Sequence, residues 1–269
     1  MEYANHLSEY DAATTLEQVR NEVETLRIAA QTNYNADVYK FCYSAIDLTT
    51  LSSCDSEQSV AEFARRAAEF TMDYPHLPNV ASICVYPPFV ETVGLEIDAT
   101  PLRITSVAGG FPSSQTFLEV KMLEVAMAIE NGADEVDVVL NVGKIMSGSL
   151  DEAANEIEVL REESEGATLK VILETGALQS PELVRQASLL AMQAGADFIK
   201  TSTGFSTAGA TKEDVALFAK YVGKDVRIKA AGGISSLADA EDFINLGATR
   251  LGTSRIVKIA KNEESNAAY

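Results

Sequence analysis

The chain has 269 residues, of which 46% are hydrophobic, and a formal net charge of −19 at pH 7. This length suits one large domain, residues 1–269, because no Pro/Gly/Ser-rich linker divides the middle of the sequence. The excess of acidic residues argues against nucleic-acid binding, which needs clustered lysine and arginine, and no apolar run approaches the ~20 residues that span a bilayer, so no membrane partner is expected.

The first residues, Met1–Tyr10, include acidic side chains and lack the basic start and apolar stretch of a secretory signal. We therefore expect a cytoplasmic protein. Residues 1–42 are expected to be an N-terminal helical extension, in which Thr14–Tyr34 forms an amphipathic helix.

The cysteines and histidines do not form a metal-binding pattern. Cys42, Cys54 and Cys84 are odd in number and show neither a Cys-x-x-Cys spacing nor a nearby histidine pair. The two histidines, His6 and His76, stand in a polar N-terminal stretch and a proline-rich loop, where we expect them to be solvated. We therefore predict three reduced thiols and no metal.

From about residue 43 onward, short apolar runs alternate with longer segments whose apolar residues recur every three or four positions. This alternation predicts eight strands, each followed by a helical segment. The predicted strands are Tyr43–Leu48, Val80–Tyr86, Leu102–Val107, Glu135–Val142, Leu169–Glu174, Phe198–Ser202, Arg227–Ala231 and Arg250–Gly252.

Capping residues mark where several of the predicted helices begin and end. Ser56 with Glu57, Ser180 with Pro181, and Thr211 are typical of helix starts. Gly132 and Gly195 stand where a helix should stop just before a strand. The repeated punctuation indicates one βα unit used many times.

Eight βα units in this length predict a (β/α)₈ barrel with an extra N-terminal helix that caps the bottom of the barrel. An open, doubly wound parallel sheet is the main alternative. In barrels of this kind the chemistry lies at the carboxyl ends of the strands, so the polar residues there are the candidates for function.

Two lysines interrupt apolar strands of this pattern. Lys200 follows Phe198 and Ile199, and Lys229 lies in the middle of the next predicted strand. A buried ammonium group needs a partner or releases its proton, and the neutral amine is a nucleophile toward carbonyl carbon. Neighbouring like charges lower the pKa of one amine, which favours a Schiff-base role for Lys200. The alternative is an interior ion pair with Asp137 or Glu174.

Asp137 belongs to a strand on which Glu135, Asp137 and Val139 share one face. If this face points inward, Asp137 meets the two lysines across the barrel. We predict that it transfers protons, although it could instead serve to neutralise the lysines.

Three glycine turns follow the sixth, seventh and eighth predicted strands and suggest an anion pocket. They contain Gly204, Gly232 with Gly233, and Gly252, which is followed closely by Ser254. Backbone amides at these positions commonly hold a phosphate in barrels, and the hydroxyls of Ser235 and Ser236 would add donors.

Several segments resemble the deoxyribose-phosphate aldolase family. DEVDVV (134–139), FIKTSTG (198–204) and KAAGG (229–233) are similar to its signature segments, and IDLTTL (46–51) and SICVYP (82–87) to its first two strands. The resemblance runs from about Asp47 to Ser254. It implies a class I aldolase without metal or cofactor, which reversibly cleaves 2-deoxy-D-ribose 5-phosphate to D-glyceraldehyde 3-phosphate and acetaldehyde.

The resemblance also implies roles for individual residues. Lys200 would form the imine, Lys229 would hold down the pKa of Lys200, and Asp137 would relay protons. Tyr269, at the end of a flexible tail formed by residues 262–269, would fold over the site as an acid or base; the alternative is a disordered tail. Substrate contacts are expected from Asp47, Thr49, Cys84, Thr203, Gly204, Gly232, Gly233, Gly252, Ser254 and Arg255. For Cys84, aldehyde damage and a buried apolar role stay open as alternatives.

The chain departs from the family pattern at the phosphate end. Phe205 stands where some relatives carry a basic residue after the Ser-Thr-Gly turn, and Arg255 follows Ser254. We predict that Arg255 compensates by helping to hold the phosphate.

Two other functions compete with this aldolase. One is a different lysine-dependent aldolase for keto sugars or keto acids, but no arginine for a carboxylate stands beside Lys200. The other is a non-catalytic barrel that senses sugar phosphate, which would have no use for two buried lysines because they cost stability. The partners expected are a phosphorylated sugar, aldehydes and a second copy in a homodimer.

Overall fold

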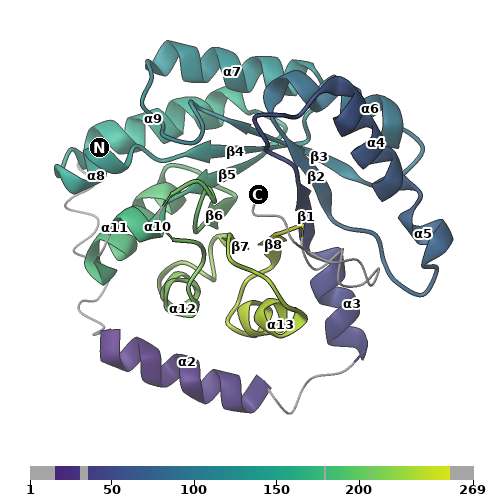
Figure 1. Cartoon of the computed structure of the whole chain (residues 1–269). Helices are drawn as coiled ribbons and strands as arrows, with labels where there is room; N and C mark the ends of the chain where they lie inside the picture. The colour runs from purple at the N-terminus through teal and green to yellow at the C-terminus, as the bar shows by residue number, and fades with distance from the viewer. Residues whose placement is uncertain (1–15, 31–35, 179, 207, 255–269) are drawn as a thin grey trace.

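The computed structural model describes residues 16–30, 36–178, 180–206 and 208–254. Within these residues eight parallel strands form a closed barrel in chain order, with the first strand paired to the last (Figure 1). The strands are β1 (Ile46–Thr49), β2 (Ser82–Val85), β3 (Arg103–Ala108), β4 (Glu135–Val139), β5 (Thr168–Ile172), β6 (Phe198–Lys200), β7 (Arg227–Ala231) and β8 (Arg250–Gly252). The (β/α)₈ barrel is confirmed, and the doubly wound sheet is wrong.

Helices surround the barrel on its outer side (Figure 1). They are α2 (Leu16–Ala30), α3 (Ala36–Ser44), α4 (Glu57–Ala68), α5 (Phe70–Asp73), α6 (Val90–Ile97), α7 (Leu118–Glu130), α8 (Val142–Met146), α9 (Leu150–Glu163), α10 (Thr175–Leu178), α11 (Pro181–Gln193), α12 (Lys212–Tyr221) and α13 (Leu237–Asn245), with a short 3₁₀ helix, η1 (Pro87–Phe89). The predicted helix starts are confirmed: the side chains of Ser56, Ser180 and Thr211 each accept a hydrogen bond from a backbone amide of the first turn.

The strands are shorter than predicted where a neighbouring element takes the residues. Tyr43 and Ser44 belong to α3, so β1 begins at Ile46. At the end of β4, the side chain of Asn141 caps α8 by accepting a hydrogen bond from the amide of Lys144, and the strand stops at Val139. An N-cap of this kind marks the start of a helix, so the residues after Asn141 are helical and no longer belong to the strand.

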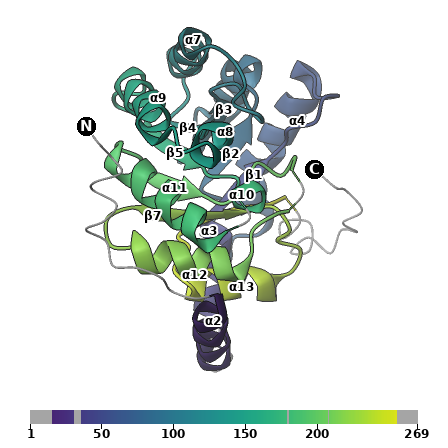
Figure 2. The ribbon, with the colours of Figure 1, turned by 90° about the vertical axis from the view of Figure 1, so that its left-hand side faces the viewer.

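The N-terminal helix α2 is present but does not cap the bottom of the barrel. It packs on the outer side of α12 and α13, as both views of the ribbon show (Figures 1 and 2). Val19 and Val23 are buried, and Arg20 and Arg27 form ion pairs with Glu213 and Asp242. The expectation of a capping position was wrong because the apolar stripe of α2 fits the outer surface of these two helices.

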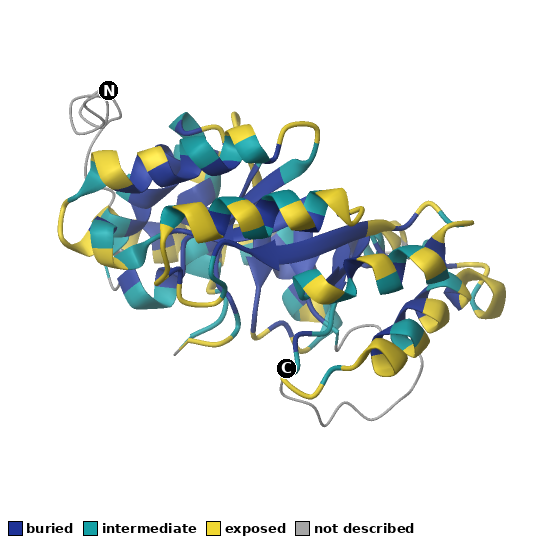
Figure 3. Cartoon of the chain, turned by 90° about the horizontal axis from the view of Figure 1, so that it is seen from above, coloured by how far each residue is buried: buried dark blue, intermediate teal, exposed yellow. Residues whose placement is uncertain are grey.

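Burial follows the pattern of a parallel sheet covered on both faces. Every residue of β2, β4, β6 and β8 is buried, whereas the helices are exposed on their outer sides (Figure 3). In the part of the chain that the structure describes, no helix combines the length and apolarity needed to cross a membrane. Several charged side chains are nevertheless buried inside the barrel.

Candidate active site

Three lysines meet the carboxylate of Asp137 inside the barrel. Lys200 Nζ lies 2.7 Å and Lys229 Nζ 2.8 Å from Asp137 Oδ2, and Lys170 Nζ lies 2.9 Å from Asp137 Oδ1. All four side chains are almost completely buried. The prediction that Asp137 meets Lys200 and Lys229 across the barrel is confirmed, and so is the ion pair that we considered as the alternative for Lys200.

The strand register brings these residues together. Lys200 and Lys229 are direct partners on β6 and β7, and Asp137 is paired with Lys170 on β4 and β5. Side chains on adjacent parallel strands at the same height point to the same face. Each pair therefore points into the barrel, and Lys200 and Lys229 lie two residues further toward the carboxyl ends than the level of Asp137 and Lys170.

A second set of charges lies nearer the amino ends of the strands. Asp47 contacts Lys229, lies 3.4 Å from Lys170, and accepts a 2.7 Å hydrogen bond from Arg250. Arg250 also lies 3.0 Å from Glu135, and Lys170 contacts Glu135. Asp47, for which we expected a substrate contact, thus pairs with Lys229 and Arg250 and is completely buried.

Among these groups Lys200 differs in its protonation. Burial and the neighbouring charge of Lys229 lower the pKa of Lys200, although Asp137 opposes this shift. For Lys229 and Lys170, burial would also lower the pKa, but Asp137 and Asp47 outweigh it and raise the pKa of both. Lys200 is therefore the lysine of this cluster that most readily becomes a neutral amine.

The carboxylates stay ionised because cations surround them. Burial alone would raise the pKa of Asp137, but Lys170, Lys200 and Lys229 together hold it well below its ordinary value. In the same way Lys170, Lys229 and Arg250 hold down the pKa of Asp47. Asp137 thus faces the lysines as an anion.

The balance of charges in the cluster also indicates that one of its lysines is neutral. Apart from Arg103, whose side chain is 48% exposed, four side chains that can be cationic face three carboxylates: Lys170, Lys200, Lys229 and Arg250 against Asp47, Glu135 and Asp137. An unbalanced buried charge is costly. The loss of one proton removes the excess, and the pKa shifts assign that loss to Lys200.

Sequence reasoning missed Lys170 and Arg250. Lys170 stands between Leu169 and Val171 in an apolar strand, which is the same signal that identified Lys200, and it could have been found in the same way. Arg250 begins a three-residue strand, where no pattern of apolar residues shows which way the side chain points. Its inward position depends on the pairing of β8 with β1 and β7.

Thr49 and Cys84 lie at the ends of β1 and β2. The hydroxyl of Thr49 donates to the carbonyl of Asp47, 2.9 Å away. Cys84 is completely buried, and burial raises the pKa of its thiol, although Lys229 and Lys200 oppose this. The thiol is therefore poorly ionised next to the lysines.

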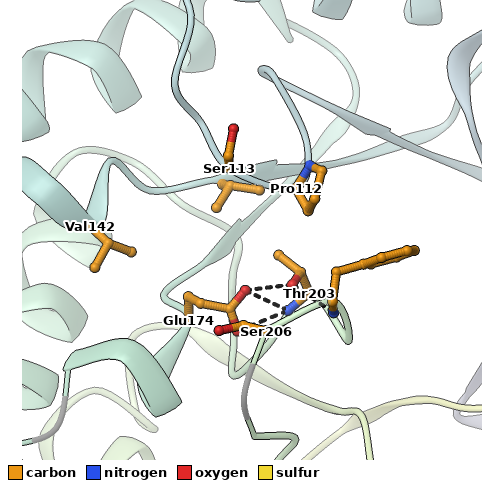
Figure 4. A pocket seen from close by; sticks show the side chains of 8 residues that line it. Pro112, Ser113, Val142, Glu174, Thr203 and Ser206 are labelled. Atoms are coloured by element: carbon orange, nitrogen blue, oxygen red, sulfur yellow. Dashed lines mark hydrogen bonds between the residues drawn. The ribbon is translucent and has the colours of Figure 1, made fainter.

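A cavity of about 270 Å³ opens at the carboxyl ends of β4, β5 and β6 (Figure 4). Its lining is Pro112, Ser113, Val139, Val142, Glu174, Thr203, Phe205 and Ser206. In Figure 4 Pro112 and Ser113 lie on one side of it and Glu174 and Thr203 on the other. Val139 and Thr203 follow Asp137 and Lys200 by two and three residues, so the cavity lies at the strand ends just beyond these two residues.

Glu174 and Thr203 fasten two neighbouring turns to each other. The carboxylate of Glu174 accepts hydrogen bonds from the hydroxyl and the backbone amide of Thr203. Glu174 has φ 52°, a left-handed conformation that is uncommon for a residue other than glycine. Thr203, for which we expected a substrate contact, therefore lines the cavity and holds Glu174.

The glycine turns lie where they were predicted, after β6 and β7 and at the end of β8. Gly232 and Gly233 have φ 81° and 78°, so that their amides are presented in left-handed turns, and Gly204 has φ 90°. A Cβ on Gly252 would lie 2.8 Å from the Cβ of Ala231, too close for another residue. Ser254 is half-buried in the segment after β8.

The hydroxyls of Ser235 and Ser236 are already engaged with Asp239. Ser235 donates to the carboxylate of Asp239, and Ser236 accepts from its amide in a capping box at the start of α13. Both were expected to donate to a phosphate. For Ser235 this expectation needs correction, because its hydroxyl donates to Asp239, whereas the hydroxyl of Ser236 only accepts in the capping box and its role as a donor stays a prediction. Arg255 and Tyr269 lie outside the described residues. Within those residues no cluster of three or more His, Cys, Asp or Glu side chains is placed to hold a metal ion.

We predict that Asp47→Asn destabilises the folded protein by about 3 to 5 kcal/mol, because the change leaves Lys229 and Arg250 buried without their full counter-charge. The measurement is the free energy of unfolding from urea titration. Asp225→Asn, at an exposed position before β7, is the control and should change stability by less than about 0.5 kcal/mol. Equal stability of the two variants would contradict the prediction.

Known proteins resemble this chain in both sequence and structure. The sequence profile of the DeoC/LacD family aldolases matches residues 41–251. A deoxyribose-phosphate aldolase of Streptococcus pyogenes is 50% identical over 185 residues, which are 69% of this chain and 82% of that protein. The solved deoxyribose phosphate aldolase of Aeropyrum pernix has a TM-score of 0.73 at 28% identity over 88% of this chain and 96% of its own. The aldolase QR15 has a TM-score of 0.74 at 32% identity over 85% and 97%. The chain therefore belongs to the DeoC/LacD family of aldolases.

Proposed function

We propose that this aldolase reversibly cleaves 2-deoxy-D-ribose 5-phosphate to D-glyceraldehyde 3-phosphate and acetaldehyde through an imine on Lys200. The observation that carries the proposal is the geometry of Lys200: its buried ammonium lies 2.7 Å from Asp137 and is the direct strand partner of Lys229, which contacts the same carboxylate oxygen. In keeping with this, burial and Lys229 lower the pKa of Lys200. The named substrate is that of the S. pyogenes and A. pernix relatives.

In the first step the neutral amine of Lys200 attacks C1 of the open-chain sugar. The new C–N bond forms as the carbonyl oxygen takes up a proton, and the amine nitrogen loses one. Asp137, whose Oδ2 lies 2.7 Å from Lys200 Nζ, is placed to accept that proton, and Lys229, 2.8 Å from the same oxygen, supplies a cation beside it. Loss of water then gives the protonated imine.

In the second step the C2–C3 bond breaks. The C3 hydroxyl gives up its proton, C3 becomes the aldehyde carbon of glyceraldehyde 3-phosphate, and the electron pair of the broken bond moves through C2 and C1 to the imine nitrogen, which leaves an enamine. A proton then adds to C2, and water hydrolyses the imine to acetaldehyde and the free amine. We assign the proton transfers to Asp137, which has Lys200 and Lys229 as its hydrogen-bonding partners.

The phosphate of the substrate is assigned to the turns that contain Gly204, Gly232 and Gly233, together with Gly252, Ser254 and Arg255. Left-handed glycine turns present successive amides to one point, which suits an anion. Thr49, Cys84 and Thr203 remain proposed contacts for the carbon chain.

Arg255→Ala should raise the KM for 2-deoxy-D-ribose 5-phosphate about tenfold and leave the KM for unphosphorylated 2-deoxyribose unchanged, because the guanidinium would contact the phosphate alone. Steady-state kinetics with both sugars is the measurement, and Arg255→Lys, which keeps the charge, is the control. An unaltered KM for the phosphorylated sugar would refute the role of Arg255.

Turnover tests the proposed function itself. Release of glyceraldehyde 3-phosphate from 2-deoxy-D-ribose 5-phosphate separates an enzyme from a protein that merely binds sugar phosphate. In the synthetic direction, acetaldehyde should act as the donor and pyruvate should not, since the keto-acid aldolases are the alternative. Turnover with pyruvate alone would move the substrate assignment to that class.

We also propose a cytoplasmic location, a homodimer and a role for Tyr269 as a mobile acid or base at the end of the C-terminal tail. With such a function the enzyme would serve the catabolism of deoxyribonucleotides.

Deletion of Tyr269 should slow the exchange of the methyl protons of acetaldehyde with solvent, and an unchanged rate would remove Tyr269 from the mechanism.

A further inference from the structure

A fourth completely buried lysine lies outside the catalytic cluster. Lys121, on α7, donates hydrogen bonds of 2.7 Å to the hydroxyl of Ser114 and to Oε2 of Glu156 on α9. A buried ion pair often stabilises the folded protein less than apolar residues of the same volume would. Stability alone therefore does not explain a lysine at this position. The reaction proposed above does not use it.

Glu156 has a second cationic partner besides Lys121. Its other carboxylate oxygen lies 3.1 Å from Lys144, whose ammonium also contacts Glu152. Of the two lysines that contact Glu156, Lys121 is the one that also donates a hydrogen bond to Ser114. The particular contribution of Lys121 is therefore its hydrogen bond to the loop that contains Ser114.

Ser114 occupies a constrained position in the loop between β3 and α7. It is completely buried, has φ 60°, and donates a 2.7 Å hydrogen bond to the carbonyl of Val139, the last residue of β4. Lys121, Ser114 and Val139 thus form a continuous chain of hydrogen bonds from a peripheral helix to the carboxyl end of a barrel strand. The loop is tied again at Gly110, whose amide donates to Glu124.

The tied loop forms one wall of the cavity described above. Pro112 and Ser113 line that cavity, opposite Glu174 and Thr203 (Figure 4). Phe111 packs edge-on against Phe205, with ring centroids 5.5 Å apart, and thereby joins this loop to the turn after β6 that follows Lys200. A shift of the loop would therefore change the shape of this cavity, which lies just beyond the end of β6 that carries Lys200.

We propose that Lys121 is a positioning residue for the aldol reaction: by holding Ser114 it fixes the 110–114 loop as the wall against which the aldehyde or sugar chain binds. This inference rests on the proposed function, because it concerns the same cavity. Lys121 acts through the loop and does not contact the reacting atoms. Its loss should consequently weaken substrate binding more than it slows the chemical step.

The test uses Lys121→Met and Ser114→Gly, each of which removes one end of the hydrogen bond. Glycine at position 114 keeps the positive φ without strain, so this variant separates the lost hydroxyl from a lost backbone conformation. Lys144→Met is the matched control, since it removes a cation from Glu156 without touching the loop. Kinetics with 2-deoxy-D-ribose 5-phosphate and hydrogen exchange of residues 109–117 are measured for all three.

We expect Lys121→Met and Ser114→Gly to raise KM about tenfold with kcat within about threefold of the parent, and to speed exchange in residues 109–117. Lys144→Met should leave both KM and the exchange of residues 109–117 unchanged. An unchanged KM in a folded Ser114→Gly protein, a loss confined to kcat, or the same effect from Lys144→Met would overturn the proposal. If the parent protein shows no aldol turnover, the proposed function fails, whereas the exchange data still decide whether Lys121 holds the loop.

Discussion

Treatment with acetaldehyde and borohydride is expected to leave a single reduced ethyl group on Lys200, and Lys200→Met should remove this adduct and lower kcat at least about 10⁴-fold. The reason is that Lys200 has a lowered pKa, while Lys170 and Lys229 are held as cations by carboxylates. A protonated amine has no electron pair for the carbonyl carbon. Peptide mass spectrometry after trapping locates the adduct, and turnover of 2-deoxy-D-ribose 5-phosphate gives the rate.

Methionine is close to lysine in length and needs no solvation, so the Lys200→Met chain should fold. Lys224→Met, at an exposed position, is the control and should keep both the adduct on Lys200 and full turnover. An adduct spread over surface lysines, with Lys200 unmodified, would contradict the imine mechanism. It would instead favour a barrel that binds sugar phosphate without catalysis.

Lys229→Met should move the acidic limb of the pH–rate profile to higher pH. The charge of Lys229 is one of the two causes that lower the pKa of Lys200, burial being the larger. Without that charge the pKa of Lys200 rises, and Asp137 keeps the amine protonated up to a higher pH. At neutral pH the fraction of neutral amine falls, so we expect kcat/KM to drop about 10² to 10³-fold and to recover in part as the pH is raised.

The measurement for Lys229 is kcat/KM between pH 5 and pH 10, since this quantity reports the groups of the free enzyme. Lys229→Arg keeps a cation at this position, so its acidic limb should stay near that of the parent even though its rate falls. An acidic limb that does not move in Lys229→Met would show that Lys229 does not lower the pKa of Lys200. A limb that moves to lower pH would reverse the sign of the proposed coupling.

The barrel could be predicted because its evidence is local. Apolar runs, capping residues and glycine stops each depend on neighbours a few positions away, and together they fixed the order and type of the eight strands. Lys200, Lys229 and Asp137 could be found for the same reason: a charged residue within an apolar strand is visible in a short stretch of sequence. The boundaries of β1 and β4 were less accurate, because α3 and the cap at Asn141 compete for the same residues.

The sequence by itself thus determined the fold class, the family resemblance and the lysines that carry the proposed chemistry. The tertiary structure shows that the pKa of Lys200 is lowered and that of Lys229 is raised, because each depends on burial and on charges that come from other strands, such as Asp47 and Asp137. It also decided that Arg250 points inward and that Lys121 reaches the loop at Ser114. Arg250 and Asp47 are far apart in the chain, and closure of the barrel brings them within hydrogen-bonding distance. Lys121 and Ser114 are only seven residues apart, but the sequence does not show that this lysine is buried against the loop and not turned to solvent.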